Sequence, residues 1–357
     1  MIKFDTITND HVNPFMITWD TGPRCNFDCS YCPVHRHDNY SKHATLAELV
    51  STIDFIQQYI NTISPYRKDN TYYISLTGGE PTVNPNFIKL SEYLEQWKKN
   101  FDPSITVRLD LTTNGAMSEK ICNTVIKHFD HVTISHHQEA DITIRNNVLD
   151  RILQFKSSGI PMKVNVMMHA NHFTECMELC NTLEQNDVKY IARPIGEDPD
   201  SILNTAHKYS DSQVEWFSNT YGKTMTKTTR PCCGGRSFTL CDSTTGSCTD
   251  TKVIDNRNFK DWHCSVNWHF LHIEQKEGLV YHHQTCQATF NHSRGSIGTL
   301  VNSHEIIDNL RHKLESNTLE TVVCPNKLCG CGLCVPKAKE LSDYQNIIGR
   351  TIKIKSI

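Results

Sequence analysis

This chain lacks the features that mark membrane, secreted and nucleic-acid-binding proteins. Its 357 residues contain no apolar run that approaches the length of a membrane-spanning helix. Residues 1–10 are polar and lack the hydrophobic core of a secretory signal. The formal net charge is only −3, so we expect no broad basic surface for gripping phosphates. These absences predict a cytoplasmic protein whose partners include neither a membrane nor a nucleic acid.

Cysteine, by contrast, is abundant, with 16 residues that fall mostly in short clusters. Disulfides are typical of small secreted domains, whereas this chain is large and has no export signal. Reduced thiolates that hold iron explain the clusters better. The 19 histidines are scattered, and the neighbours His136 and His137, like His282 and His283, would point to opposite faces of a strand. Such pairs favour hydrogen-bonding or solvated roles over a metal site.

Three cysteines near the N-terminus, Cys25, Cys29 and Cys32, form a CxxxCxxC loop. A [4Fe-4S] cube held by only three cysteines keeps one iron open for a ligand that is not protein. The alternative is a zinc loop, because short cysteine spacings also suit a tetrahedral zinc ion.

A second motif, LTGGEP at residues 76–81, favours the iron-sulfur interpretation. It follows an apolar and aromatic run, residues 72–76, that is typical of a β-strand. Adjacent glycines let a backbone approach a ligand, and carbonyl groups at a strand end can accept hydrogen bonds from an ammonium group. Alone, Gly-Gly-Glu-Pro would be an ordinary turn, but together with the three cysteines it is a specific signal.

The two motifs together resemble the radical S-adenosylmethionine (SAM) superfamily, down to the aromatic Tyr31 just before the third cysteine. The resemblance implies that the open iron of the cluster chelates the amino and carboxylate groups of SAM. It also implies that the element formed by Gly78, Gly79, Glu80 and Pro81 holds the methionine amine.

Short β-type runs alternate with helical patterns from residue 14 to about 196, which indicates repeated βα units and a parallel sheet. The order resembles the partial (β/α)6 TIM barrel of radical SAM proteins, an α/β fold in which ligand loops sit at the carboxyl ends of strands. The pattern predicts helices over residues 45–60 and 86–97, and six strands over residues 15–18, 72–76, 106–112, 131–135, 162–168 and 190–194.

Two further strand ends carry polar residues that the resemblance places near SAM. By position, Asn114 follows the third strand and Ser135 ends the fourth, so both are expected to approach the sulfonium, carboxylate or ribose of SAM. Arg145 and Arg193 are weaker candidates for binding the carboxylate. Taken alone, each of these residues would fit a turn or a helix cap as well as it would fit a SAM-binding role.

We expect a partial barrel over residues 1–200, a loop-rich linker over 201–260, a cysteine-rich module over 261–340 and a tail over 341–357. The linker carries four cysteines, and buried inert thiols are the simplest interpretation of each one. Adjacent cysteines cannot easily bind one metal, so at most one of the first two is an expected ligand. The four are Cys232, Cys233, Cys241 and Cys248.

The expected module begins with Cys264, and a predicted β-hairpin with a glycine-containing turn leads to Cys286. This pattern is similar to the start of the SPASM and twitch modules of radical SAM proteins, where such a hairpin supplies two ligands of an auxiliary [4Fe-4S] cluster. A glycine-rich knot completes the cysteine set with Cys324, Cys329, Cys331 and Cys334.

The simplest ligand set for one auxiliary cluster is Cys264, Cys286, Cys331 and Cys334. A second auxiliary cluster would need a linker cysteine. A structural zinc knot made by the four cysteines from residue 324 to 334 is the alternative.

The resemblance implies an enzyme that reductively cleaves SAM to a 5′-deoxyadenosyl radical and abstracts hydrogen from a C–H bond. Flavodoxin or ferredoxin is the implied electron donor, and the auxiliary cluster favours a net oxidation. Only 24 residues precede Cys25, which favours a small-molecule substrate over the peptide of a SPASM-type maturase that cross-links or epimerises. A non-catalytic electron carrier is a third interpretation, but it does not explain the Gly-Gly-Glu-Pro element.

Overall fold

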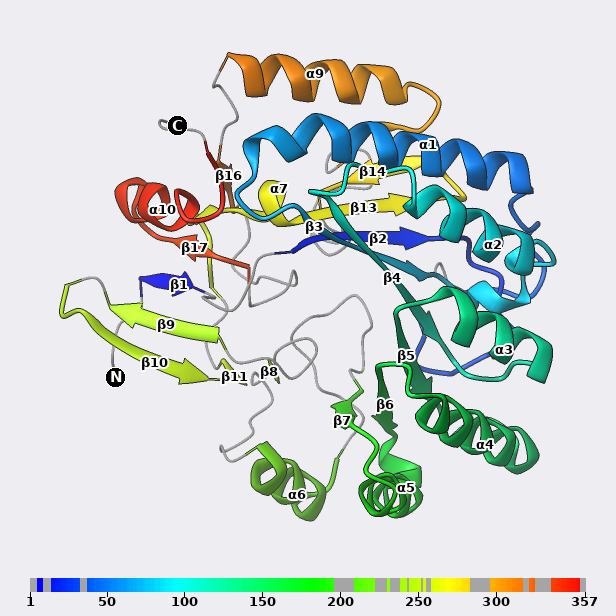
Figure 1. Cartoon of the computed structure of the whole chain (residues 1–357). Helices are drawn as coiled ribbons and strands as arrows, with labels where there is room; N and C mark the ends of the chain where they lie inside the picture. The colour runs from blue at the N-terminus through cyan, green and yellow to red at the C-terminus, as the bar shows by residue number, and fades with distance from the viewer. Residues whose placement is uncertain are drawn as a thin grey trace.

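A curved sheet of nine strands, with helices along its outer face, organises the molecule (Figure 1). The computed structural model describes residues 5–8, 14–32, 37–195, 209–221, 230–231, 238–242, 244–251, 253–254, 258–282, 296–316, 321–324 and 335–353. The sheet order is β15-β14-β13-β2-β3-β4-β5-β6-β7. Its strands are β2 (Phe15–Asp20), β3 (Thr71–Thr77), β4 (Thr106–Thr113), β5 (His131–His136), β6 (Met162–Met168), β7 (Tyr190–Pro194), β13 (Phe270–Glu274), β14 (Leu279–Tyr281) and β15 (Ser296–Thr299).

Strands β2 to β7 are all parallel, as the predicted partial (β/α)6 barrel requires. One helix connects each strand to the next, as in repeated βα units. The first of these helices, α1, begins with a capping box in which the side chains of Thr45 and Glu48 each accept a hydrogen bond from the other's backbone N–H. The helices are α1 (Leu46–Ile63), α2 (Phe87–Lys98), α3 (Glu119–His128), α4 (Ile142–Ser158), α5 (Phe173–Gln185), α6 (Asp211–Tyr221), α7 (Val266–His269), α9 (Ser303–Glu315) and α10 (Leu341–Ile348), with short 3-10 turns at Ser64–Tyr66, Pro81–Val83 and Ala170–His172.

The two faces of the parallel strands differ sharply in polarity. Apolar side chains such as Ile17, Ile74 and Val164 are fully buried under the helices. Their neighbours along each strand point to the concave side and are largely polar, as in Ser75 and Thr133. The concave side therefore offers hydrogen-bonding groups to a ligand instead of an apolar barrel core.

The predicted C-terminal hairpin is present as β13 and β14, with Gly278 in the turn at a φ of +63°. The hairpin does not stand apart, because β13 pairs in parallel with β2 and so extends the barrel sheet. Helix α9 covers this extension beside α1 (Figure 1). None of the helices in the described ranges is long and apolar enough to cross a membrane.

A second, six-stranded sheet includes two strands, β9 and β10, from the segment in which the sequence predicts a loop-rich linker. Its order is β10-β9-β1-β17-β12-β16, so it joins the N-terminal strand β1 to segments from the last third of the chain. The pairings of β1 with β9 and β17 link residues more than 200 positions apart, which local periodicity cannot reveal. Its strands are β1 (Thr6–Thr8), β9 (Phe238–Asp242), β10 (Ser247–Thr251), β12 (His263–Cys264), β16 (Val322–Val323) and β17 (Lys337–Ala338), and a separate pair is formed by β8 (Arg230–Pro231) and β11 (Val253–Ile254).

Candidate active site

Three thiols from one loop line a single cavity at the carboxyl ends of the parallel strands. The loop follows β2 and carries Cys25, Cys29 and Cys32, and the cavity they share has a volume of about 310 Å³. Within the described residues, no three His, Cys, Asp or Glu side chains converge on one metal ion. Three thiols that face one cavity are the donor set that a [4Fe-4S] cluster with one open iron would use.

Backbone hydrogen bonds fix this loop against the glycine pair that ends β3. The N–H of Gly79 donates to the carbonyl of Gly22 at 2.9 Å, and the N–H of Glu80 donates to the carbonyl of Arg24 at 2.9 Å. A Cβ atom on Gly79 would lie 2.3 Å from the carbonyl oxygen of Pro23, which is far inside van der Waals contact. The lack of a side chain at Gly79 therefore lets the cysteine loop pack directly against the backbone at this position. Gly79 also lines the cavity, so its backbone is accessible to a ligand there.

Glu80 lies beneath the cavity and joins the ends of two strands. Its carboxylate accepts hydrogen bonds from the backbone N–H and hydroxyl of Thr82 at 3.0 and 2.6 Å, and from the hydroxyl of Thr113 at 2.8 Å. The N–H of Asn114 donates to the other oxygen at 2.6 Å. Burial raises the pKa of Glu80, while these donors lower it. Pro81 is also buried and begins the turn that follows.

The other residues predicted to bind SAM divide between two locations. Asn114 and Ser135 line the same cavity as the three thiols. The Asn114 amide nitrogen lies 2.7 Å from the side-chain oxygen of Asn26 and 3.9 Å from the Cys25 sulfur. Arg145 bonds instead to Gln138, and Arg193 lines a neighbouring cavity.

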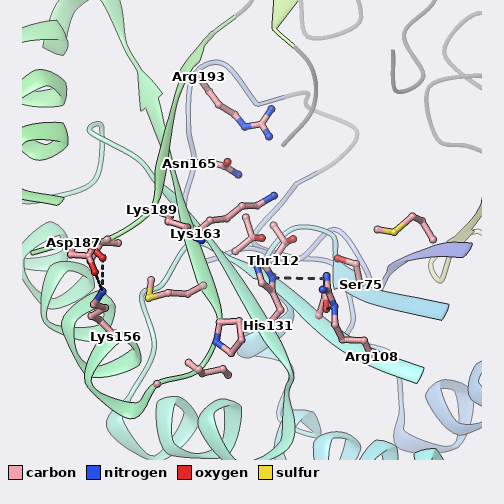
Figure 2. A pocket seen from close by; sticks show the side chains of 18 residues that line it. Ser75, Arg108, Thr112, His131, Lys156, Lys163, Asn165, Asp187, Lys189 and Arg193 are labelled. Carbon is pink, nitrogen blue, oxygen red and sulfur yellow. Dashed lines mark hydrogen bonds and ion pairs between the residues drawn. The ribbon is translucent and has the colours of Figure 1, made fainter. Parts of the chain in front are cut away.

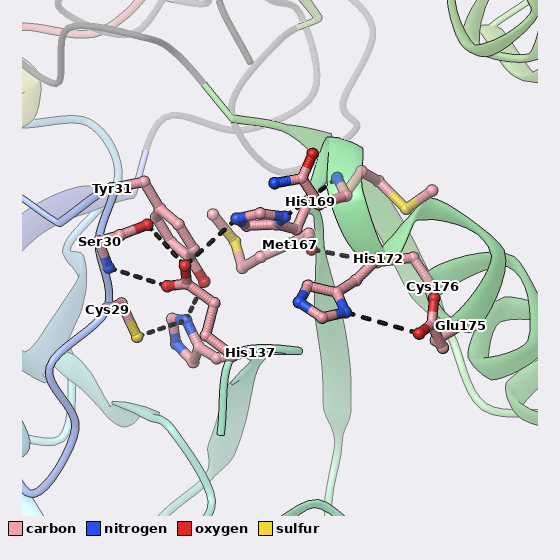
Figure 3. Close-up of polar contacts among 12 residues, drawn as sticks. Cys29, Ser30, Tyr31, His137, Met167, His169, His172, Glu175 and Cys176 are labelled. Carbon is pink, nitrogen blue, oxygen red and sulfur yellow. Dashed lines mark hydrogen bonds and ion pairs between the residues drawn. The ribbon is translucent and has the colours of Figure 1, made fainter. Parts of the chain in front are cut away.

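A polar network beside Cys29 joins Tyr31 and His137, two residues that the sequence did not link to each other (Figure 3). His137 Nδ1 lies 2.5 Å from the Tyr31 hydroxyl and 3.5 Å from the Cys29 sulfur. Glu139 accepts hydrogen bonds from the N–H and hydroxyl of Ser30 at 2.8 and 2.6 Å, and it lies 3.2 Å from His169 Nε2. His137 directly follows β5 and lines the thiol cavity together with Ser135.

Burial sets the protonation of these groups. It raises the pKa of Cys25 and raises that of Cys29 to about 12, so both thiols are neutral at pH 7 without a metal. Burial also lowers the pKa of His137 to about 4, so its imidazole is neutral. Cationic iron would favour the thiolates and offset the cost of burying their charge.

The C-terminal cysteines are only partly within the described residues. Cys264 ends β12 and Cys324 follows β16, and both are buried. The N–H of Cys324 donates to the carbonyl of Trp262 at 2.9 Å, which continues the antiparallel pairing of β12 with β16. Cys264 is opposite Val322, two positions before Cys324, so the two cysteines lie on the same face of the sheet. Four cysteines of the predicted module lie outside the described residues, as do two of the linker. They are Cys286, Cys329, Cys331, Cys334, Cys232 and Cys233.

The expectation of reduced thiols is wrong for the other two linker cysteines. Cys241 and Cys248 form a disulfide between β9 and β10. The antiparallel register sets these residues directly opposite each other, so their sulfur atoms meet. In this state neither residue can be a thiolate ligand of a second auxiliary cluster.

Part of the chain, including the site, is similar to a known family. Residues 19–178 match the Radical SAM superfamily. A 7-carboxy-7-deazaguanine synthase from Methanothermobacter thermautotrophicus is 30% identical over 155 residues, which cover 40% of this chain and 55% of that protein. A probable GTP 3′,8-cyclase from Saccharolobus solfataricus is 24% identical over 188 residues, covering 48% of this chain and 55% of that protein. The chain thus spans about half the length of these two relatives.

A structural comparison supports the fold. The solved structure of native anSMEcpe with bound AdoMet aligns with a TM-score of 0.50 and 13% sequence identity. The alignment covers 94% of this chain and 96% of that one. At this identity the likeness concerns the fold alone.

Proposed function

We propose that the radical SAM domain at residues 19–178 holds a [4Fe-4S] cluster through Cys25, Cys29 and Cys32 and cleaves SAM reductively. The observation that carries the proposal is that the three thiols line one cavity with the backbone of Gly78 and Gly79. When bound, the cluster supplies the electron that splits SAM into methionine and a 5′-deoxyadenosyl radical, which removes a hydrogen atom from a substrate C–H bond.

The chain's own residues would position SAM. Backbone groups of Gly78 and Gly79 face the cavity and offer carbonyl oxygens to the methionine amine. The Asn114 amide and the Ser135 hydroxyl offer donors to the carboxylate or ribose. Glu80 would act through its bonds to Thr113 and Asn114, as a positioning residue that holds these strand ends together.

A small-molecule substrate is favoured over a peptide. The two sequence relatives carry the names of a deazaguanine synthase and a GTP cyclase, both of which denote small-molecule chemistry. A SPASM-type peptide maturase that cross-links or epimerises is the second candidate. A non-catalytic electron carrier is the third, but such a protein needs no cavity with a glycine-lined wall beside its cluster.

We infer one auxiliary [4Fe-4S] cluster in the C-terminal part. Its support is that Cys264 of the expected ligand set is buried beside the strand that leads to Cys324, and that Cys324 lies shortly before two further members of the set, Cys331 and Cys334, in sequence. Such a cluster would accept the electron left after hydrogen abstraction, which makes the reaction a net oxidation. Iron analysis after anaerobic reconstitution should give about eight irons per chain. The Cys264→Ala variant should retain about four, and zinc in their place would contradict the inference.

The reaction also requires a reductant, and we propose flavodoxin or ferredoxin in the cytoplasm. Electron paramagnetic resonance (EPR) of the reduced, reconstituted protein tests the proposal at the site. SAM should alter the cluster signal in the wild type and in Cys122→Ala, a control that removes a buried thiol on α3. The Cys29→Ala variant should lose the signal of this cluster. A wild-type signal that ignores SAM would contradict the proposal.

A further inference from the structure

A second and larger cavity lies inside the curved sheet, on the concave face of β3 to β7 (Figure 2). Its volume is about 710 Å³, which is ample for a metabolite-sized ligand. Its wall includes Ser75 of β3, Thr112 of β4, Thr133 of β5 and Asn165 of β6. This polar wall indicates a binding space for a polar ligand.

The cavity is strongly basic. Five Lys and Arg side chains line it against two Asp side chains, with His131 in addition. The two aspartates are already engaged, since Asp110 accepts two hydrogen bonds from Arg108 at 2.7 and 2.6 Å and Asp187 lies 2.7 Å from Lys156. By formal charge, the five basic side chains of the lining exceed its two aspartates by three.

Two buried polar atoms point to a ligand in this space. The Asn165 side chain is only 8% exposed, and its Oδ1 atom has no hydrogen-bond partner among the described residues. The Nε atom of Arg193 on β7 is also buried and has no hydrogen-bond partner among the described residues. Figure 2 shows Arg193, Asn165, Lys163 and Lys189 around the same space. A buried polar atom without a hydrogen bond lowers the stability of the folded protein. A bound molecule that accepts a hydrogen bond from Arg193 and donates one to Asn165 would remove this free-energy cost.

This cavity adjoins the one that holds the three thiols. Thr112 lines both cavities. Met167 lines the thiol cavity and stands opposite Arg193 in the β6–β7 register. A molecule anchored near Arg193 would therefore extend toward the place where SAM is expected.

We propose that the basic cavity binds the oxyanion group of the substrate, a phosphate or a carboxylate. This inference rests on the proposed function, because it places the substrate beside the SAM cavity. The Arg193 guanidinium donates to the oxyanion, and Lys163 and Lys189 supply further positive charge. Asn165 accepts a hydrogen bond from a hydroxyl or amine of the same substrate. The substrate class is thus a small, anionic metabolite that also carries a hydrogen-bond donor.

Calorimetric titration of the anaerobically reconstituted full chain with inorganic phosphate and with malonate tests the proposal and separates the two anion types. Arg193→Gln should weaken binding of the preferred anion at least tenfold. Arg311→Gln removes a half-exposed arginine on α9 and should leave binding unchanged. Asn165→Asp adds a negative charge inside the cavity, so it should abolish anion binding even where the arginine variant folds poorly.

Each other outcome would overturn the proposal. Equal anion affinity in the wild type and Arg193→Gln would show an adventitious ion only. Loss of SAM affinity in Arg193→Gln with unchanged anion affinity would assign the arginine to the SAM carboxylate instead. SAM cleavage without substrate, measured in the same samples, distinguishes this failure from a failure of the proposed function. If SAM is cleaved but no anion binds specifically, the substrate assignment is wrong and the proposed function stands.

Discussion

The backbone N–H of Asn114 donates a 2.6 Å hydrogen bond to the buried carboxylate of Glu80. This bond joins the end of β4 to the turn after β3, and the same turn is bonded to the cysteine loop through Arg24. Glu80 thus couples three segments that wall the thiol cavity, because its carboxylate holds the end of β4 and its backbone N–H holds the cysteine loop.

Replacing Glu80 by Gln tests this coupling. A glutamine amide would turn two hydrogens toward groups that are themselves donors, so we expect a loss of about 1–3 kcal/mol in the free energy of unfolding. We also expect weaker SAM binding, because Asn114 shifts. Urea unfolding and SAM titration measure both effects, with Glu92→Gln on the exposed side of α2 as the control. Wild-type values for Glu80→Gln would refute its positioning role.

Gly79→Ala should lower cluster content as well as SAM binding. Even a methyl group would lie 2.3 Å from the carbonyl of Pro23 and 2.5 Å from that of Arg24, so the cysteine loop must move. Iron and sulfide analysis after reconstitution provides the measurement. Gly349→Ala is the comparison, since Gly349 has a helical φ of −59° and should retain full iron. Full iron in Gly79→Ala would mean that the loop tolerates displacement.

His137→Phe should lower the reduction potential of the N-terminal cluster. Once Cys29 is a thiolate it can only accept hydrogen bonds, and the tautomer of His137 with its proton on Nδ1 donates to this sulfur across 3.5 Å. Removing a donor to a ligating sulfur disfavours the reduced, more negative state. Redox titration monitored by EPR measures the potential, with His172→Phe as a control on a side chain that contacts Glu175. An unchanged potential would show that His137 bonds only to Tyr31.

Stability should fall as pH falls below about 6.5, partly because of His269. Burial, and secondarily the charge of Arg67, lowers its pKa to about 3 in the folded state. Between about pH 6.5 and 3 the unfolded chain therefore binds a proton that the folded chain excludes. The unfolding free energy should drop by up to about 1.4 kcal/mol per pH unit for this group.

Urea unfolding at pH 7 and 5.5 gives the slope. Glutamine does not titrate, so His269→Gln should reduce this pH slope of the unfolding free energy by up to about 1.4 kcal/mol per pH unit below pH 6.5. The exposed His304 on α9 supplies the control variant His304→Gln, which should keep the wild-type slope. An identical slope in His269→Gln would mean that His269 is protonated or accessible in the folded protein.

The sequence predicted the barrel well because its signals are local. Each parallel strand combines apolar residues with a turn at its end, and the predicted spans 162–168 and 190–194 coincide with β6 and β7. The motif residues 25, 29, 32 and 78–79 likewise fall at strand ends that the parallel register brings together.

What the sequence could not predict depends on contacts between distant segments. The pairing of β9 with β1 brings together segments more than 200 positions apart in the chain. His137 gains its role from Cys29 and Tyr31, more than 100 positions earlier. The basic cavity is likewise assembled from side chains on separate strands, each of which alone is an ordinary surface charge.

The most direct test of the central claim is the formation of 5′-deoxyadenosine from SAM by the anaerobically reconstituted protein with a chemical reductant. We expect the wild type and Cys122→Ala to form it, and the variant with Cys25, Cys29 and Cys32 all replaced by Ala to form none while it keeps its C-terminal iron. Formation of 5′-deoxyadenosine by that triple variant, or its absence with the fully loaded wild type, would contradict the assignment.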